Sequence, residues 1–308
     1  MARLAPGGQI RQMQRLAQQV WLERPQTANS GATVGELAWE WGSGRGQRAA
    51  GWTQRVWFED GDAVAWGWIF APERIRVSAT EWELSDTSLA WQAAPGRPAL
   101  VAEVLQWFDA CAGGAPQATT ARAADAQALR QLRRLGYARD PDAPWFQLNT
   151  RALDRLTEPG LPPGFRFLTA AQADPALVVA AHRAAWHPSA FSAGSLDDVR
   201  STWPYRDDLA VFIEAPDGRL AASALVWYDD VTRTAELEPV GTDPGFRGRG
   251  LGRAVSLLGL RAARDAGAAE AMVSCRGDER YPVPRRLYRS AGFTELTRDL
   301  VFRKRVHW

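Results

Sequence analysis

The sequence predicts an α/β (α+β) chain made of two similar domains in tandem, each with a central sheet flanked by helices. First, a strand-like run over 234–242 leads through a glycine-rich turn into an amphipathic helix. Second, a stretch rich in Pro and Gly over 156–164 has the composition of a domain boundary. Third, two turn signals recur after 157 and 156 residues. They are Asp60-Gly61 with Asp217-Gly218, and Gly136-Tyr137 with Gly292-Phe293.

The first half reads as helix, hairpin, helix, helix and strand. Apolar residues at helical spacing predict the first helix, which Pro25 ends. Strand-like runs on both sides of Asp60-Gly61 predict the hairpin, and glycines close the two later helices. The expected elements are a helix over 8–23, a hairpin of 55–59 with 63–70, helices over 100–108 and 125–135, and a strand over 145–148.

The second half repeats this order. Apolar runs at 210–214 and 220–227 flank the turn residues 216–218, which predicts a second hairpin. After the glycine-rich turn, apolar residues step by three or four along one helix face: Leu251, Val255, Leu258, Ala262 and Ala266. Gly292 is expected to stop a later helix in the left-handed conformation, with the next strand starting at Phe293.

Composition narrows the class of protein. The 308 residues carry a formal net charge of +2, which lends no support to a nucleic-acid partner. The two cysteines lack a partner at metal or redox spacing, and the three histidines show no metal-ligand spacing. No apolar run could span a membrane, and residues 1–19 lack a secretory pattern. We therefore expect a cytoplasmic protein without a metal, a membrane or a nucleic-acid partner.

The stretch Arg247–Gly252 has the features of an anion cradle. Its glycines let the backbone approach a bulky anion, and the helix that follows turns its N–H groups toward the same place. Arg247, Arg249 and Arg253 add positive charge. The P-loop pattern is absent, and the dinucleotide pattern lacks its last glycine. On this stretch alone, a plain helix N-terminus with glycines for close packing is an equal alternative.

Two motifs together resemble those of the GNAT superfamily of N-acetyltransferases. Arg247, Gly250 and Gly252 match its coenzyme A loop, Arg-x-x-Gly-x-Gly, and 287–293 is similar to its Leu-Tyr-x-x-x-Gly-Phe signature. With the second hairpin, the resemblance covers residues 164–306. It implies a mixed, mostly antiparallel sheet in each domain and acetyl-CoA as the acetyl donor. The residues it implies for binding acetyl-CoA are Val240, Thr242, Arg247, Gly248, Arg249, Gly250, Leu251, Gly252 and Arg253.

The two halves differ at the positions that carry this resemblance. We predict a degenerate N-terminal acetyltransferase-like domain over 1–155, a linker over 156–164 and a catalytic domain over 165–308. At the place of the loop, the first half has residues 91–98, without Arg-x-x-Gly-x-Gly, and Leu132 stands where the second half has Tyr288. The first half is therefore expected to be catalytically silent and to build the substrate cleft or an interface.

Acetyl transfer to an amine needs a polarised carbonyl, a base and an acid. The resemblance places backbone N–H groups of Val240 and Thr242 at the carbonyl. It favours Glu236 as the base, with Glu238 second; both face one side of a regular strand, and a bulge would change that facing. Tyr288 is the expected acid. The alternatives are solvent-facing charges for the two glutamates and simple packing for the tyrosine.

The helix that carries the tyrosine departs from the superfamily pattern. Seven residues before the tyrosine, the superfamily often has an Asn that contacts the coenzyme, with an Ala three residues after it. Tyr281 and Pro284 stand at these positions, so Arg285 or Arg286 would have to compensate.

The function predicted from the sequence is acetyl-CoA-dependent N-acetylation of a primary amine on a small molecule by direct attack. The alternatives are a non-catalytic acyl-CoA-binding module and a protein N-acetyltransferase. Acceptors are recognised by variable loops, so the sequence leaves the acceptor open, together with the choice between a monomer and a homodimer.

Overall fold

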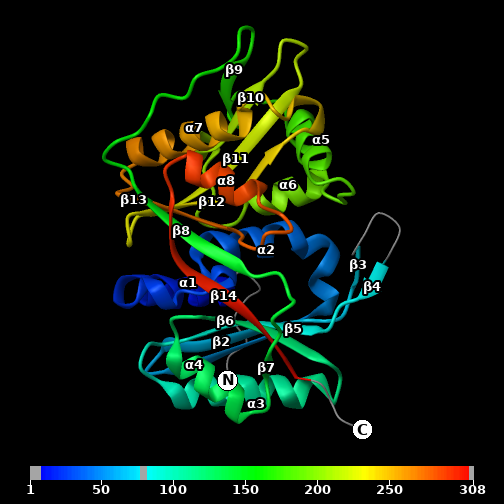
Figure 1. Ribbon diagram of the computed structural model, residues 1–308, viewed down its shortest axis with the longest axis vertical. Helices are drawn as coiled ribbons and strands as arrows, with labels where there is room; N and C mark the ends of the chain where they lie inside the picture. The colour runs from blue at the N-terminus through cyan, green and yellow to red at the C-terminus, as the bar shows by residue number, and fades with distance from the viewer. Residues whose placement is uncertain (1–7, 77–81, 305–308) are drawn as a thin grey trace. The chain divides into compact units, whose positions relative to one another are not determined.

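The computed structural model describes residues 8–76 and 82–304, and Figure 1 shows the course of the chain. The chain folds into two compact units, each with most of its contacts inside itself. The described part of the first unit comprises 8–33, 48–76, 82–147 and 297–304. The second unit comprises 34–47 and 148–296.

The first unit is a mixed sheet with helices packed on it. The strand order is β1-β2-β5-β6-β14; β5 and β6 run parallel, and the other neighbours in this order run antiparallel. The helices α1 and α3 contact β2, and α4 contacts β6. The elements are α1 (Gly8–Glu23), η1 (Pro25–Thr27), η2 (Ser30–Ala32), η3 (Ala49–Gly51), β1 (Trp52–Glu59), β2 (Asp62–Phe70), β3 (Arg74–Arg76), β4 (Trp82–Leu84), β5 (Thr87–Ala93), α3 (Pro98–Ala112), β6 (Gln117–Arg122), α4 (Ala126–Arg134), β7 (Ala138–Arg139) and the larger part of β14 (Thr294–Lys304).

The second unit has the same plan. Its strand order is β8-β13-β12-β11-β10-β9; β12 and β13 run parallel, and β9 to β12 form antiparallel pairs. The elements are α2 (Val34–Arg48), β8 (Phe146–Ala152), β9 (Arg166–Thr169), α5 (Pro175–Ala185), α6 (Ala193–Arg200), η4 (Asp207–Leu209), β10 (Ala210–Glu214), β11 (Leu220–Asp229), β12 (Thr234–Thr242), η5 (Pro244–Phe246), α7 (Leu251–Asp265), β13 (Glu270–Arg276) and α8 (Val283–Ser290). The predicted fold class, two tandem domains with mixed sheets flanked by helices, is therefore confirmed.

Alternate residues of the central strands in the second unit supply two cores. On one face, Val226 and Leu237 pack with Leu257 of α7 and with α8. On the other face, Trp227 packs with residues of α2, α5 and α6. Because successive strand residues point to opposite faces, each face of the sheet can bury its own helical layer.

Local sequence signals account for most element boundaries. The helix predicted over 8–23 and the strand predicted over 234–242 have those bounds in the structure. Asp125 caps α4 by accepting from the Ala128 N–H at 3.0 Å, and Gly292 ends α8 with φ 86°, as predicted. Turn and cap chemistry therefore decides where these elements start and stop.

The helix α2 was not predicted. Its sequence contains four glycines, which weaken a helix interior, although Thr33 and Glu36 have the spacing of a capping box that could have identified its start. Residues 34–47 belong to the second unit, and residues 297–304 at the end of β14 belong to the first. The predicted domain over 1–155, linker over 156–164 and domain over 165–308 follow the repeat in the sequence, and these boundaries stay a prediction.

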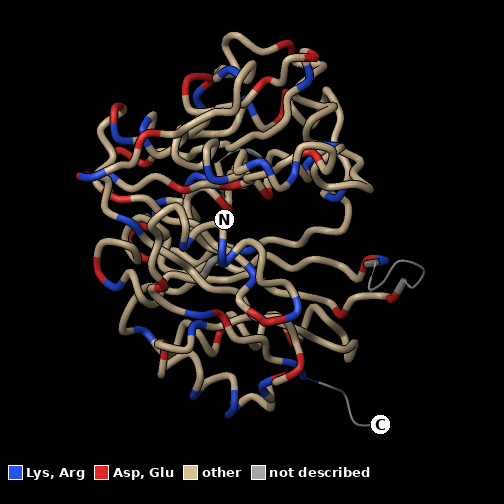
Figure 2. Tube along the Cα trace, turned by 45° about the horizontal axis from the view of Figure 1, so that its top comes forward, with Lys and Arg blue, Asp and Glu red and all other residues tan. Residues whose placement is uncertain are grey.

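Charges are mixed along both units. Figure 2 shows Lys and Arg interspersed with Asp and Glu along the trace, consistent with the net charge of +2. Each helix within residues 8–76 and 82–304 is too short or too polar to cross a lipid bilayer.

Candidate active site

The strand β12 separates from β13 halfway along its length. The two strands pair in parallel from Thr234 to Glu236 of β12, and the pairing ends there in the described chain. On its other edge, β12 stays paired with β11 as far as Thr242. The second half of β12 therefore has one open edge, which faces the end of β13.

A bulge interrupts β12 at the start of this open edge. Val226 pairs with Leu237 and Ala224 pairs with Val240, so one residue of β11 lies opposite both Glu238 and Pro239. The bulge considered from the sequence is thus present, and it contains Glu238, whereas Glu236 pairs regularly with Trp227. Their facing cannot be read from the simple alternation of a regular strand.

Glu236 lies at the N-terminus of α2. Its side chain is 3% exposed, and Oε2 accepts hydrogen bonds from the Gly35 N–H at 2.8 Å and the Glu36 N–H at 3.3 Å. Backbone N–H groups at a helix start stabilise a negative charge, so α2 favours the ionised carboxylate. Sequence reasoning missed this partner because it comes from 200 residues earlier in the chain.

Glu238 has a different electrostatic environment. Burial raises its pKa to about 8, and the neighbouring negative charges of Glu236 and Glu40 act in the same direction. Glu40 lies on α2, next to Trp39. A carboxyl group with a pKa near neutrality can both accept and release a proton, which is the property of a general base.

Tyr288 lies on α8 with its side chain 7% exposed. Burial raises its pKa well above 10, and the charges of Glu238 and Cys275 raise it further. Its ring packs edge-on against Phe293, with centroids 5.8 Å apart, inside the core of the second unit. The phenol therefore stays protonated at neutral pH and can serve as a proton donor.

The glycine-rich turn leads into α7 as predicted. Gly248 and Gly250 both have φ 77°, and nothing lies within 4 Å of a Cβ added at either position. The first helical hydrogen bond runs from the Ala254 N–H to the Gly250 carbonyl. The amides of Leu251, Gly252 and Arg253 consequently have no acceptor within the helix and are oriented to bind an anion.

The arginines around this turn have different roles. Arg247 Nε donates to the Thr242 carbonyl at 3.3 Å, and Arg253 Nε donates to the Ser290 carbonyl at 2.9 Å. Arg249 lies over the Phe246 ring, 5.7 Å from its centroid. Two of the three arginines therefore bind backbone carbonyls next to the turn, which keeps positive charge at the cradle.

The predicted carbonyl-polarising residues Val240 and Thr242 are half-buried on the open part of β12. Both lie after the bulge, where the edge toward β13 is unpaired.

The segment at which the sequence departs from the superfamily pattern lies at and just before α8. Tyr281 lies just before the helix and is 49% exposed. On the helix, Arg285 binds the Gly277 carbonyl and Glu279. Arg285 thus binds the segment that follows β13.

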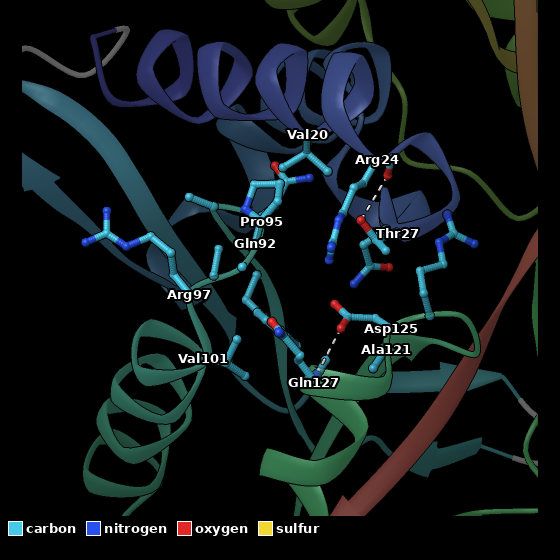
Figure 3. A pocket seen from close by; sticks show the side chains of 17 residues that line it. Val20, Arg24, Thr27, Gln92, Pro95, Arg97, Val101, Ala121, Asp125 and Gln127 are labelled. Carbon is cyan, nitrogen blue, oxygen red and sulfur yellow. Dashed lines mark hydrogen bonds between the residues drawn. The ribbon is translucent and has the colours of Figure 1, made fainter.

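The first unit repeats the separated strands without the loop. β5 and β6 pair from Thr87 to Leu89 and then separate beside a hollow (Figure 3). Its lining includes Gln92, which is 5% exposed, and the buried Arg122, which pairs with Asp299 at 3.0 Å. Leu132, the counterpart of Tyr288, is fully buried. A splayed sheet is therefore present in both units, whereas the cradle and the tyrosine occur in the second.

A metal site finds no support in the structure. Among residues 8–76 and 82–304, the side chains of His, Cys, Asp and Glu form no group of three that could hold a metal ion. His182 stacks between aromatic rings, and His307 lies outside the described residues.

Comparison with known sequences finds a family model that part of the second unit matches. Residues 178–293 match the Acetyltransferase (GNAT) family. Curated relatives include the mycothiol acetyltransferase of Saccharopolyspora erythraea, 33% identical over 57% of this chain and 58% of that protein. The mycothiol acetyltransferase of Frankia alni is 31% identical over 57% of this chain and 55% of that protein. The chain thus matches little more than half the length of these relatives.

Solved structures share the fold of the whole chain. A GCN5-related N-acetyltransferase from Sphaerobacter thermophilus has a TM-score of 0.62 at 18% identity, over 99% of this chain and 95% of that chain. A tandem GNAT protein from the clavulanic acid biosynthesis pathway has a TM-score of 0.64 at 15% identity, over 99% and 98%. At these identities the likeness concerns the fold, and it confirms the predicted tandem plan.

Proposed function

We propose that this chain transfers the acetyl group of acetyl-CoA to a primary amine of a small molecule, since residues 178–293 match the Acetyltransferase (GNAT) family. The main support is the open edge of β12, which starts at the bulge. Glu238 lies in this bulge, and its charge raises the pKa of Tyr288. A base and an acid thus act on each other beside an opening in the sheet.

The loop after β12 would hold the donor. The amides at the start of α7 and the charges of Arg247, Arg249 and Arg253 suit a pyrophosphate. The open edge of β12 would take the arm that carries the thioester, and the backbone N–H groups of Val240 and Thr242 would polarise its carbonyl.

In the proposed reaction, the amine nitrogen attacks the thioester carbonyl carbon. The new C–N bond forms and the C–S bond breaks, which releases the coenzyme A thiolate. Glu238 takes the proton that the amine nitrogen loses, and the Tyr288 hydroxyl protonates the thiolate. Burial raises the pKa of Glu238, and the nearby charge of Glu236, which accepts from the amides at the start of α2, raises it further.

Calorimetric titration with acetyl-CoA tests donor binding. The wild type is expected to bind one molecule per chain, since the first unit lacks the loop. Gly250→Glu should abolish binding, because it puts a carboxylate into the cradle. Gly61→Glu is the matched control, since Gly61 is also left-handed, with φ 92°, and open around its Cβ position. Failure of the wild type to bind would exclude the proposed reaction.

Release of the coenzyme A thiol in the presence of amines tests turnover. A mycothiol-related amine is the first acceptor to try, since two relatives are named for mycothiol. Binding without turnover on any amine would favour the acyl-CoA-binding module. Turnover on peptide amines in preference to small ones would favour the protein N-acetyltransferase.

A further inference from the structure

Trp227 of β11 lies directly opposite Glu236 of β12 in the sheet. Residues that face each other in an antiparallel pair point to the same face, so both side chains lie on the face where α2 packs. The indole is 1% exposed and packs with Ala38 of α2 and with Leu225, two residues away on its own strand. Trp227 is therefore a core residue that lies beside the proposed reaction centre.

The indole of Trp227 also makes a hydrogen bond to the bulge of β12. Its Nε1–H donates to the Glu238 carbonyl oxygen at 2.6 Å. Leu225 lies opposite both Glu238 and Pro239, and an extra residue in one strand disrupts the hydrogen bonds of the ladder. Pro239 has no N–H to contribute. A side-chain donor from the neighbouring strand thus takes the place of a ladder donor at the bulge.

The same edge of the indole lies against the helix start that binds Glu236. A Cβ added at Gly35 would lie 2.7 Å from Trp227 Cδ1, the ring atom bonded to Nε1, and 2.5 Å from Glu236 Oε2. The Gly35 N–H donates to that carboxylate oxygen at 2.8 Å. One side chain therefore adjoins both the backbone of Glu238 and the group that holds Glu236.

We propose that Trp227 is a positioning residue for the proposed base: its indole N–H fixes the bulge of β12, and the bulge sets the direction of the Glu238 side chain. The proposal rests on the proposed function and adds a residue that acts through Glu238. Without the indole donor, the Glu238 carbonyl would lose its hydrogen bond. The bulge would then relax, and the carboxyl group of Glu238 would turn away from the reacting amine.

Trp227→Phe tests this role, because it removes the donor and keeps an aromatic ring in the core. The kcat for acetyl transfer should fall by roughly 10²-fold, since a displacement of about 1 Å at a reacting group costs this much. The KM for acetyl-CoA should stay close to the wild-type value, because the turn before α7 is unchanged. Thiol release at saturating amine gives both constants.

The pH profile of Trp227→Phe provides a second measurement. Burial is the main cause of the raised pKa of Glu238, and a carboxyl group that has turned away is less buried. The rise of kcat/KM with pH should therefore move to lower pH. Glu236, Glu40 and Tyr288 interact electrostatically with Glu238, and all of them stay in place in this variant.

Trp66→Phe is the matched control. Trp66 of β2 is 0% exposed, and its indole N–H has no hydrogen-bond partner within residues 8–76 and 82–304. The substitution removes the same atoms from a buried position in the first unit without removing a hydrogen bond. It should lower the free energy of unfolding and leave both kcat and the pH profile unchanged.

Trp227→His separates positioning from packing. Imidazole can keep an N–H donor at the place of the indole Nε1, but it lacks the six-membered ring. This variant should be less stable in urea than Trp227→Phe and yet have the higher kcat at pH 8, where an ordinary imidazole is neutral. If Trp227 served packing alone, kcat would follow stability, and Trp227→Phe would be the more active variant.

The outcomes separate the two proposals. Wild-type kcat and an unchanged pH profile in Trp227→Phe would overturn the positioning role and leave acetyl transfer intact. A kcat that is higher in Trp227→Phe than in Trp227→His, or an equal loss of kcat in Trp66→Phe, would also overturn it. Absence of turnover in the wild type would overturn the proposed function and the positioning role together.

Discussion

The Gly35 N–H donates to Glu236 Oε2 over 2.8 Å, so a helix start and a strand residue 201 positions apart form one site. The helix begins at Val34 and is part of the second unit, although it precedes the whole first sheet in the chain. A variant of the second half that lacks residues 34–47 would take these donors away from Glu236.

Gly35→Ala should disturb the contact between α2 and Glu236. An added Cβ would lie 2.5 Å from Glu236 Oε2 and 2.7 Å from Trp227 Cδ1, so the carboxylate must move. We expect a loss of about 1–3 kcal/mol in the free energy of unfolding and a lower kcat. Urea unfolding and steady-state kinetics measure both.

The matched control is Gly46→Ala on the same helix. There the nearest atom to an added Cβ is Asp198 Oδ2 at 3.6 Å, an ordinary contact. Alanine is the better helix former, so this variant should gain about 0.5–1 kcal/mol. If Gly35→Ala gains as much, the contact between α2 and Glu236 has no energetic weight.

Glu238→Gln should remove the titration of the base from the pH–rate profile. With the pKa of Glu238 raised to about 8, kcat/KM should rise with pH up to that value in the wild type. The variant should lose roughly 10²–10⁴ in turnover together with this rise. A profile that keeps the rise would return the role of base to Glu236.

Glu236→Gln provides the complementary measurement. Removing its charge takes away one of the repulsions that raise the pKa of Glu238. The rise in kcat/KM should therefore shift to lower pH and persist. Loss of the rise in this variant, with its retention in Glu238→Gln, would reverse the two assignments.

Tyr288→Phe should lower turnover by roughly 10²–10⁴ while acetyl-CoA still binds. The reason is that the phenol stays protonated and the variant has no proton to give to the thiolate. Tyr281→Phe is the control, since this tyrosine is 49% exposed before α8. Normal turnover in Tyr288→Phe would assign the residue to packing against Phe293.

Acid should weaken the second unit through His182. Its pKa is lowered to about 4 in the folded chain, so the folded state binds fewer protons than the unfolded state between pH 4 and 6.5. The free energy of unfolding should therefore rise with pH across this window and level off above it. In His182→Phe, which preserves stacking on Phe191 and Trp186, this rise should be smaller. Urea titrations at pH 5 and pH 7 compare the two proteins.

Local signals in the sequence determined most secondary structure and much of the candidate site. The strand over 234–242, the left-handed glycines and the start of α7 follow from spacing and turn chemistry, which act within a few residues. The motifs in 247–252 and 287–293, which resemble those of the GNAT superfamily, pointed to the glycine-rich turn and to Tyr288. The tandem plan followed from two repeated turn signals.

Tertiary structure alone decided how Glu236 and Glu238 differ. The bulge that contains Glu238, the helix α2 that binds Glu236 and the raised pKa of Glu238 all depend on segments outside β12. Helix and strand periodicity reports which face of an element is apolar. Which distant element covers that face, and which charges it brings, is settled by packing.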